Sequence, residues 1–252
     1  FGRAIVDFPA VYRMLLSMRS EIEATRALLA EAGRWVDLKK ALGGMQKRGD
    51  SDREERRRLR QVGRIADLLT PLAKYYASEM GNRICYQAIQ IHGGTGYMRE
   101  FNVERHYRDV RITSIYEGTS QLQVVGSIGA LLGHALDVLL DQWAALEYGL
   151  ELAPLKAQLE EAAASLKRCV DCLRGQKEPG VIGYYAQDLM DLALDVALSW
   201  LMLRDARVSA EKLETARFFI AEALPRIYAK VAALEAIDPS LLRVRELLQT
   251  TS

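Results

Sequence analysis

The sequence has 252 residues, 50% of them hydrophobic, so it can bury a core large enough for one elongated or two compact domains. Its 34 basic and 33 acidic residues leave a formal net charge of +1, which argues against a nucleic-acid-binding protein. No uninterrupted apolar run approaches the length of a membrane span, so no transmembrane segment is expected.

The first predicted element is a long core helix over residues 11–36. Its apolar stripe comprises Val11, Leu15, Met18, Ile22, Leu29 and Val36. A polar break over residues 43–52 follows, and a dense charge run begins at Asp52 and ends at Arg60. We interpret this run as a solvated linker and helix start, with phosphate binding as the alternative.

Helical periodicity returns between Ile65 and Ile91, where Pro71 predicts a kink or a restart. The cluster Gly93-Gly94-Thr95-Gly96 can end this helix with positive φ and let the backbone approach a ligand closely. A short helix is expected over residues 104–110, in which Arg108 and Asp109 suggest a structural ion pair.

Residues 119–146 predict one more long helix, which completes an antiparallel bundle of about four helices. The pattern restarts after Gly149, so we place one domain over residues 1–150 and a second over residues 151–252. Three further apolar stripes and a short closing helix form the second domain. The expected fold class is all-α, an antiparallel four-helix bundle followed by a second, smaller helical bundle.

Cysteine and histidine residues give little sign of metal or redox chemistry. Cys169 and Cys172 form a Cys-x-x-Cys pair, but Cys169 lies on an apolar stripe and no βαβ pattern surrounds it. Core packing is the better interpretation of this pair. The three histidines lack ligand spacing, so no metal site is predicted, and three cysteines in total fit a reducing, cytoplasmic location.

The segment Ile115-Tyr116-Glu117-Gly118-Thr119-Ser120 carries the clearest chemical signal. Aromatic and apolar neighbours disfavour the charged form of a carboxylate, which makes Glu117 a candidate general base. Thr119 or Ser120 can cap the helix that follows, whose free N–H groups favour an anion such as phosphate. The alternative is an acidic residue beside an ordinary helix N-terminus.

Three sequence blocks lie in order around this segment: Gln90-Ile-His-Gly-Gly-x-Gly-Tyr97, Val103-Glu-Arg-x-Tyr-Arg-Asp109 and Ile115-Tyr-Glu-Gly-Thr-Ser-Gln121. Together they resemble the C-terminal helical domain of flavin-dependent acyl-CoA dehydrogenases. Phe1-Gly2-x-x-Ile5 resembles the end of a further family segment, so the resemblance covers residues 1–149. Residues 151–252 resemble the additional C-terminal helical domain of longer bacterial-type members.

This resemblance implies an FAD cofactor, an acyl-CoA substrate and Glu117 as the base that removes the α-proton while a β-hydride passes to the flavin. The backbone N–H of Glu117 would bind the thioester carbonyl, with Tyr116 and Gly118 beside the substrate. The FAD contacts that the resemblance implies are Phe1, Gln90, Gly94, Thr119 and Gln121, with Gln90 and Gly94 at the adenosine end. Gln90 and Gly94 would typically reach the FAD of a neighbouring subunit.

Three departures from the family pattern stand out. The flavin-binding arginine that would precede Phe1 is absent from this sequence, and Pro9 stands where many members have glutamine. The region between Trp35 and Arg64 is longer than in short- and medium-chain members, with residues 43–52 inserted. That insertion indicates a branch that includes methylthiopropionyl-CoA dehydrogenase-like enzymes.

We therefore expect the C-terminal part of an FAD-dependent acyl-CoA dehydrogenase that catalyses α,β-dehydrogenation and passes electrons to an electron-transfer flavoprotein. A homo-oligomer is expected, with a dimer favoured because the added domain would cover the surface that smaller relatives use to form tetramers. The alternatives are an acyl-CoA oxidase-like flavoenzyme and a non-catalytic helical assembly module. The sequence opens inside a motif, so the chain alone is expected neither to hold FAD tightly nor to turn over.

Overall fold

The computed structural model describes residues 2–48 and 52–248, with the side chains of 245–248 excepted. The described part contains α-helices, short 3₁₀ helices and no strand, which confirms the predicted all-α class. The elements are η1 (Ile5–Asp7), α1 (Pro9–Lys47), α2 (Arg53–His92), η2 (Gly93–Tyr97), α3 (Asn102–Val110), η3 (Arg111–Ser114), α4 (Ser120–Leu132), α5 (Asp137–Ala144), α6 (Ala153–Arg174), α7 (Val181–Ala206), α8 (Ala210–Glu235) and η4 (Pro239–Leu248).

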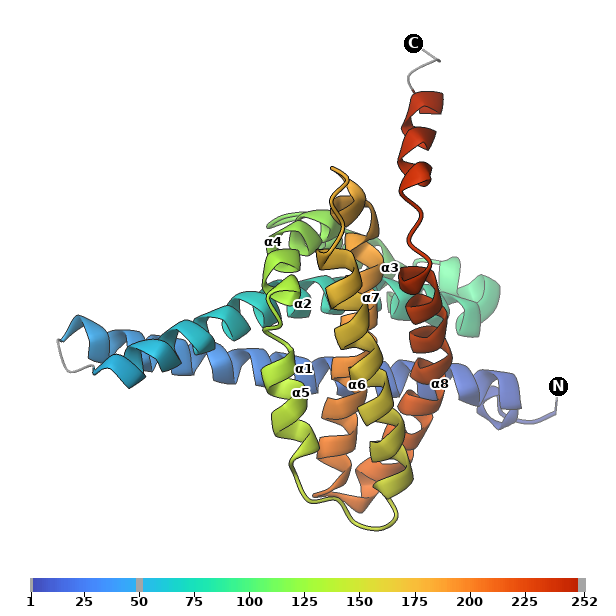
Figure 1. Cartoon of the computed structure of the whole chain (residues 1–252). Coiled ribbons are helices and arrows are strands. Elements are labelled where there is room, and N and C mark those ends of the chain that lie inside the picture. The colour runs from blue at the N-terminus through green and yellow to red at the C-terminus, as the bar shows by residue number, and fades with distance from the viewer. Residues whose placement is uncertain (1, 49–51, 249–252) are drawn as a thin grey trace.

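Helices α1 and α2 form a long antiparallel hairpin that crosses behind the upright helices α5 to α8 (Figure 1). Pro9 starts α1, where a missing N–H costs nothing. Asp52 starts α2 with a capping box: its side chain accepts from the Glu55 N–H, and the Glu55 side chain accepts from the Asp52 N–H. The predicted helix start in the charge run is therefore confirmed, and the tip of the hairpin extends beyond the other helices.

Pro71 does not restart a helix, because α2 continues through it as one element, and a kink at this residue stays a prediction. The buried side chains of Leu68, Leu69 and Leu72 surround the proline, each with no exposed surface. Packing on both sides of Pro71 therefore holds the helix together where the proline removes one backbone hydrogen bond.

The predicted apolar stripe of α1 is partly wrong. Leu15 and Leu29 are 37% and 49% exposed, whereas Ala24, Leu28 and Trp35 are buried. Helix α1 contacts α2 as well as α7 and α8, and these neighbours together cover a face centred on the buried residues. The spacing in the sequence could not show from which side α7 and α8 would approach.

The single helix predicted over residues 119–146 is also wrong, because the chain breaks between α4 and α5. His134 has a φ of 59° and occupies the left-handed position that usually takes glycine after a helix. The His134 N–H bonds to the Leu131 carbonyl, and the Ala135 N–H bonds to the Ala130 carbonyl, as in a Schellman motif. Its imidazole lies 3.0 Å from Asp137 Oδ2 and 3.1 Å from Asp171 Oδ1, which fixes the turn.

Helix α7 lies at the centre of the second half, packed against α6 and α8 and against α1 of the first half. Its Val196, Trp200 and Leu203 are fully buried, as the second stripe predicts. The buried residues of both halves form one continuous core. The domain boundary near residue 150 stays a prediction.

Cys169 is fully buried, and burial raises the pKa of its thiol to about 11, which agrees with core packing rather than redox chemistry. Cys169 and Cys172 are not bonded to each other. Within the described ranges, no single helix has the length and apolarity of a membrane span. The bent pair α4 and α5 passes that test together on length and composition alone, with a bend of 67°.

Candidate active site

The loop that carries Glu117 lies between η3 and α4 and has an unusual backbone. Glu117 has a φ of 52° and Gly118 a φ of 97°, so two successive residues occupy the left-handed region. Glycine adopts this conformation freely, whereas for glutamate it is strained. Thr119 ends the loop as the N-cap of α4, with its hydroxyl 3.4 Å from the Leu122 backbone nitrogen. The predicted capping role of Thr119 is confirmed.

Side chains from α2 and α4 hold this loop from two sides. Lys74 Nζ donates to the Gly118 carbonyl at 2.6 Å. Gln123 Nε2 donates to the carbonyl oxygens of Glu117 at 3.1 Å and of Gly118 at 3.3 Å. The Ser120 hydroxyl donates to the Glu79 carboxylate. Polar bonds from neighbouring helices thus stabilise the strained turn.

Glu117 itself is exposed, as are Tyr116 and Ile115 beside it. The apolar and aromatic neighbours expected around the Glu117 carboxylate are present. Among the described residues, however, they form an open surface and do not bury the carboxylate. Further apolar side chains continue this surface, namely Ile112, Leu122 and Val125, each more than half exposed. A surface of this kind is typical of a ligand or protein contact.

The glycine cluster ends α2 as predicted, because Gly93 follows His92 with a φ of 63°. A methyl group at Gly96 would lie only 2.6 Å from the His92 Cβ, so this glycine is required for close packing of η2 on α2. Nothing lies within 4 Å of a Cβ placed at Gly94, which leaves space in front of its backbone.

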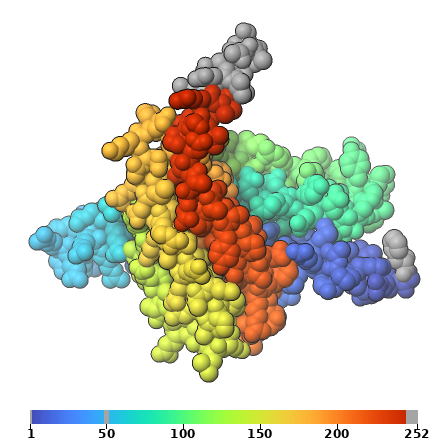
Figure 2. Space-filling view, turned by 45° about the vertical axis from the view of Figure 1, so that its right-hand side comes forward, coloured from blue at the N-terminus to red at the C-terminus, as the bar shows by residue number. Residues whose placement is uncertain are grey.

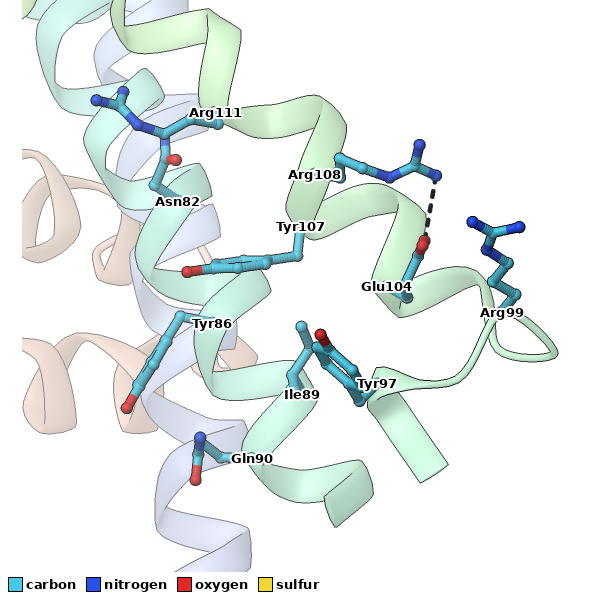
Figure 3. Close-up of a pocket in the computed structure, with 10 residues that line it drawn as sticks. All are labelled: Asn82, Tyr86, Ile89, Gln90, Tyr97, Arg99, Glu104, Tyr107, Arg108 and Arg111. Atoms are coloured by element: carbon cyan, nitrogen blue, oxygen red, sulfur yellow. Dashed lines mark hydrogen bonds and ion pairs between the residues drawn. The ribbon is translucent and has the colours of Figure 1, made fainter. Parts of the chain in front are cut away.

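A cavity of 760 Å³ opens between the end of α2, η2 and α3 (Figure 3). Tyr86 and Tyr107 lie next to each other in its lining, with ring centroids 6.5 Å apart. Gln90 and Tyr97 lie at its lower end in the view, and Arg108 at its rim is bonded to Glu104 at 3.3 Å. Asp109 is not the partner of Arg108, so the predicted pairing of these two neighbours is wrong. Successive residues on a helix point in different directions.

The structure brings Gln90 into this cavity but leaves the other predicted site residues outside its lining. Tyr116, Glu117, Gly118, Thr119 and Gln121 lie on the loop and first turn of α4, Gly94 lies in η2, and Phe1 lies outside the described residues. The assigned roles of all these residues stay predictions.

Tyr86, Tyr107, Arg99 and Arg111 line the cavity and were missed from the sequence. For Arg99, Tyr107 and Arg111 the signal was the alternation of aromatic and basic side chains between residues 97 and 111, whereas Tyr86 lies outside that segment. Aromatic faces, an amide and guanidinium groups are the chemistry that holds a nucleotide, through stacking and phosphate contacts. The residues present therefore fit a nucleotide-bearing cofactor.

Two protein families match consecutive parts of the chain. The family described as "Acyl-CoA dehydrogenase, C-terminal domain" matches residues 54–128, and the family described as "Acetyl-CoA dehydrogenase C-terminal like" matches residues 128–245. The first match includes the glycine cluster and the Glu117 loop, and the second includes helices α5 to α8.

Similar proteins match about half of the chain. The caffeyl-CoA reductase-Etf complex subunit CarC of Acetobacterium woodii is 39% identical over 52% of this chain and 28% of its own length. The 3-methylmercaptopropionyl-CoA dehydrogenase of Ruegeria pomeroyi is 38% identical over 50% of this chain and 19% of its own length. The chain thus spans less than a third of either relative in these matches.

A solved structure gives the same fold over most of the chain. The acyl-CoA dehydrogenase of Bacillus anthracis, complexed with FAD, superimposes with a TM-score of 0.67 at 22% identity. The superposition covers 94% of this chain and 44% of that structure. Both halves of the chain therefore share the arrangement of helices found in that protein.

Proposed function

This chain belongs to the acyl-CoA dehydrogenase family, and from that membership we propose that it is the C-terminal part of an FAD-dependent enzyme that oxidises the Cα–Cβ bond of an acyl-CoA thioester. The observation that carries this proposal is the exposed Glu117 on a strained turn, held by Lys74 and Gln123 at the start of α4. Strain of this kind is commonly kept at functional sites.

In the proposed reaction the Glu117 carboxylate accepts the α-proton of the thioester. FAD, when bound, supplies the acceptor for the hydride that leaves the β-carbon. Within the described residues the backbone N–H of Glu117 makes no hydrogen bond, so it is available to the thioester carbonyl. A donor at that oxygen stabilises the charge that develops as the α-proton leaves.

Gln90 and Gly94 would hold the adenosine end of FAD, and Thr119 and Gln121 would also contact FAD. Phe1 would provide a further flavin contact. The exposed cavity of Tyr86, Gln90 and Tyr107 supports this proposal, because a site completed by a neighbouring subunit must be open in one chain. The same argument supports a homo-oligomer. Within the proposal a dimer is favoured, because the added domain would cover the surface that smaller relatives use to form tetramers.

Electron transfer to an electron-transfer flavoprotein is the proposed second half-reaction. The relative from Acetobacterium woodii carries the name of an Etf complex subunit, which supports this partner. A cytoplasmic location is part of the proposal and follows from the low cysteine count.

Two alternatives have distinct signatures. An acyl-CoA oxidase-like enzyme would use the same base but pass electrons to oxygen, so it would form peroxide rapidly under air. A non-catalytic assembly module would keep the helices without needing the Glu117 carboxylate, and it would oxidise no acyl-CoA.

Anaerobic bleaching of the flavin in the whole protein that carries this chain tests the proposal. We expect a panel of acyl-CoAs to include at least one that bleaches the wild-type flavin, whereas Glu117→Gln keeps its flavin and does not bleach. Glu178→Gln is the matched control, because Glu178 is exposed in the α6–α7 loop. Bleaching of the Glu117→Gln variant at the wild-type rate would remove Glu117 from the mechanism.

A further inference from the structure

The N-terminal third of α2 carries six arginines within twelve residues: Arg53, Arg56, Arg57, Arg58, Arg60 and Arg64. Among the residues that the structure describes, no carboxylate pairs with any of their side chains. Elsewhere arginines do find acidic partners, as in Arg13 with Glu222 at 2.8 Å and Arg226 with Asp195 at 2.9 Å. This part of α2 therefore differs from the rest of a chain whose net charge is only +1.

Two physical effects make the arginine cluster unfavourable for the helix. Arginines at spacings of three and four, such as Arg57, Arg60 and Arg64, are neighbours on the helix surface and repel one another. The N-terminus of a helix also carries positive partial charge, which disfavours cations in the first turns. Glu54 and Glu55 offset part of this charge at the helix start. A bound anion would offset the remainder.

Three of these arginines converge on a defined hollow. Arg57, Arg60 and Arg64 line a cavity of 290 Å³, whose opposite wall is the turn between α4 and α5. Arg57 and Arg60 also line a second hollow of 840 Å³ that continues toward the hairpin tip. This part of the hairpin projects from the body of the molecule, so solvent reaches it freely (Figure 2).

The turn between α4 and α5, which forms the opposite wall, has small side chains and is held by hydrogen bonds. Gly133 and Ala135 contribute little side-chain volume, and His134 between them is held by Asp137 and Asp171. Asp137 and Asp171 are two carboxylates next to this wall, and Lys167 Nζ lies 4.0 Å from Asp137 and 2.9 Å from Asp141. None of these three aspartates lines the hollow itself. The free positive charge of the hollow therefore comes from the arginines.

From these observations we infer that Arg57, Arg60 and Arg64 form a binding site for a small ligand that carries two or more phosphate groups. A guanidinium group binds phosphate oxygens in a bidentate manner, and three of them around one cavity match a multiply charged group. The concave site favours a small molecule over an extended surface. Arg60 lies fourteen residues before Lys74 on one helix, roughly 20 Å away at 1.5 Å per residue, so the site is separate from the Glu117 loop.

Calorimetric titration of the whole protein with inorganic pyrophosphate, at constant ionic strength, tests this inference. Wild type is expected to bind it saturably with one site per chain. Arg60→Gln should weaken binding at least tenfold, because Arg60 lines both hollows. Arg56→Gln is the matched control: it removes the same charge from the same helix but lines neither hollow, and binding should stay within twofold.

Two further measurements separate a site from its alternatives. Without pyrophosphate, Arg60→Gln should melt at the wild-type temperature or higher, because a repulsion is removed; a lower melting temperature would indicate a structural role and contradict the inference. Vesicles of phosphatidylglycerol and phosphatidylcholine test a lipid surface. The inference would be overturned if the protein bound these vesicles but not pyrophosphate, or if it bound neither saturably. It would also be overturned if Arg60→Gln and Arg56→Gln weakened pyrophosphate binding equally.

Discussion

Lys74 Nζ lies 2.6 Å from the carbonyl oxygen of Gly118 and 5.8 Å from the centroid of the Tyr116 ring. One side chain of α2 thus contacts the residues on both sides of Glu117. Since Leu69 and Leu72 anchor α2 in the core, this lysine connects a buried part of the hairpin to a strained turn.

Replacing Lys74 by methionine should therefore displace the Glu117 loop without unfolding the protein. A displacement of about 1 Å can lower a rate by on the order of a hundredfold, so we expect kcat of the whole enzyme to fall tenfold to a hundredfold. Steady-state kinetics with the acyl-CoA that bleaches the flavin gives the value. Lys156→Met is the control, because Lys156 on α6 likewise lies over a tyrosine ring, that of Tyr148, and pairs with Glu160 rather than with the Glu117 loop. An unchanged kcat for Lys74→Met would show that Gln123 alone holds the loop.

Two glycines of η2 should respond differently to alanine. At Gly96 the added methyl meets the His92 Cβ at 2.6 Å, so we expect a loss of about 1 to 3 kcal/mol in unfolding free energy. At Gly94 nothing lies within 4 Å, so stability should change by less than about 0.5 kcal/mol while flavin content falls. Denaturant unfolding and flavin absorbance measure the two effects. Full flavin retention by Gly94→Ala would contradict a close approach of FAD to that backbone.

We expect the ionisation of Glu31 to make the free energy of unfolding depend on pH under acidic conditions. This carboxylate is only 3% exposed and accepts hydrogen bonds from Arg34, Trp35 and Arg204 at 2.5, 2.7 and 2.7 Å. Burial alone would raise its pKa, but the three hydrogen bonds outweigh that effect and hold the pKa below its usual value of 4.5. A lowered pKa contributes stability that is present above pH 4.5 and is lost as the pH falls through the pKa of the folded state.

Glu31→Gln removes this contribution and leaves Arg204 without its buried charge partner. We expect it to cost about 3 kcal/mol at pH 7 and to flatten the fall of the unfolding free energy as the pH decreases below 4.5. Glu214→Gln, which removes an exposed pair with Arg217, should do neither. Equal costs for the two variants at pH 7 would argue against a special role for the buried group.

The chain by itself should fold and remain colourless. Its core is extensive and continuous, but the candidate cofactor cavity and the Glu117 loop are both open. We therefore expect far-ultraviolet circular dichroism of a helical protein and no flavin absorbance after purification. Stoichiometric flavin in the purified chain would show that these residues alone suffice to hold FAD.

Local signals made several features predictable. The charge run from Asp52 and the glycine cluster at Gly93 mark helix ends through their own backbone chemistry, and the structure places helix ends there. The break before α5 was missed because His134 takes a position that usually belongs to glycine, with two aspartates from different helices holding it. One of those aspartates lies 37 residues away in sequence, so no local pattern could reveal it.

The candidate site likewise combines local features that the sequence reveals with long-range contacts that it does not. The Glu117 segment was recognisable because its residues are consecutive. Lys74 and Glu79 were not, since they contact the loop across more than 40 residues of chain. Tyr86 and Tyr107 meet only because α3 folds back on α2, which also required the structure.

At Glu117 the left-handed backbone lowers the stability of the fold, whereas the side chain supplies the proposed base. This conformation costs a residue with a side chain roughly 1 to 2 kcal/mol of folding free energy, a cost that glycine does not have. Glu117→Gly should therefore give a protein that melts at a higher temperature and has lost its proposed base. A directed-evolution experiment that rewarded heat resistance alone would drift toward this variant, whereas one that rewarded turnover would keep glutamate and accept the weaker fold.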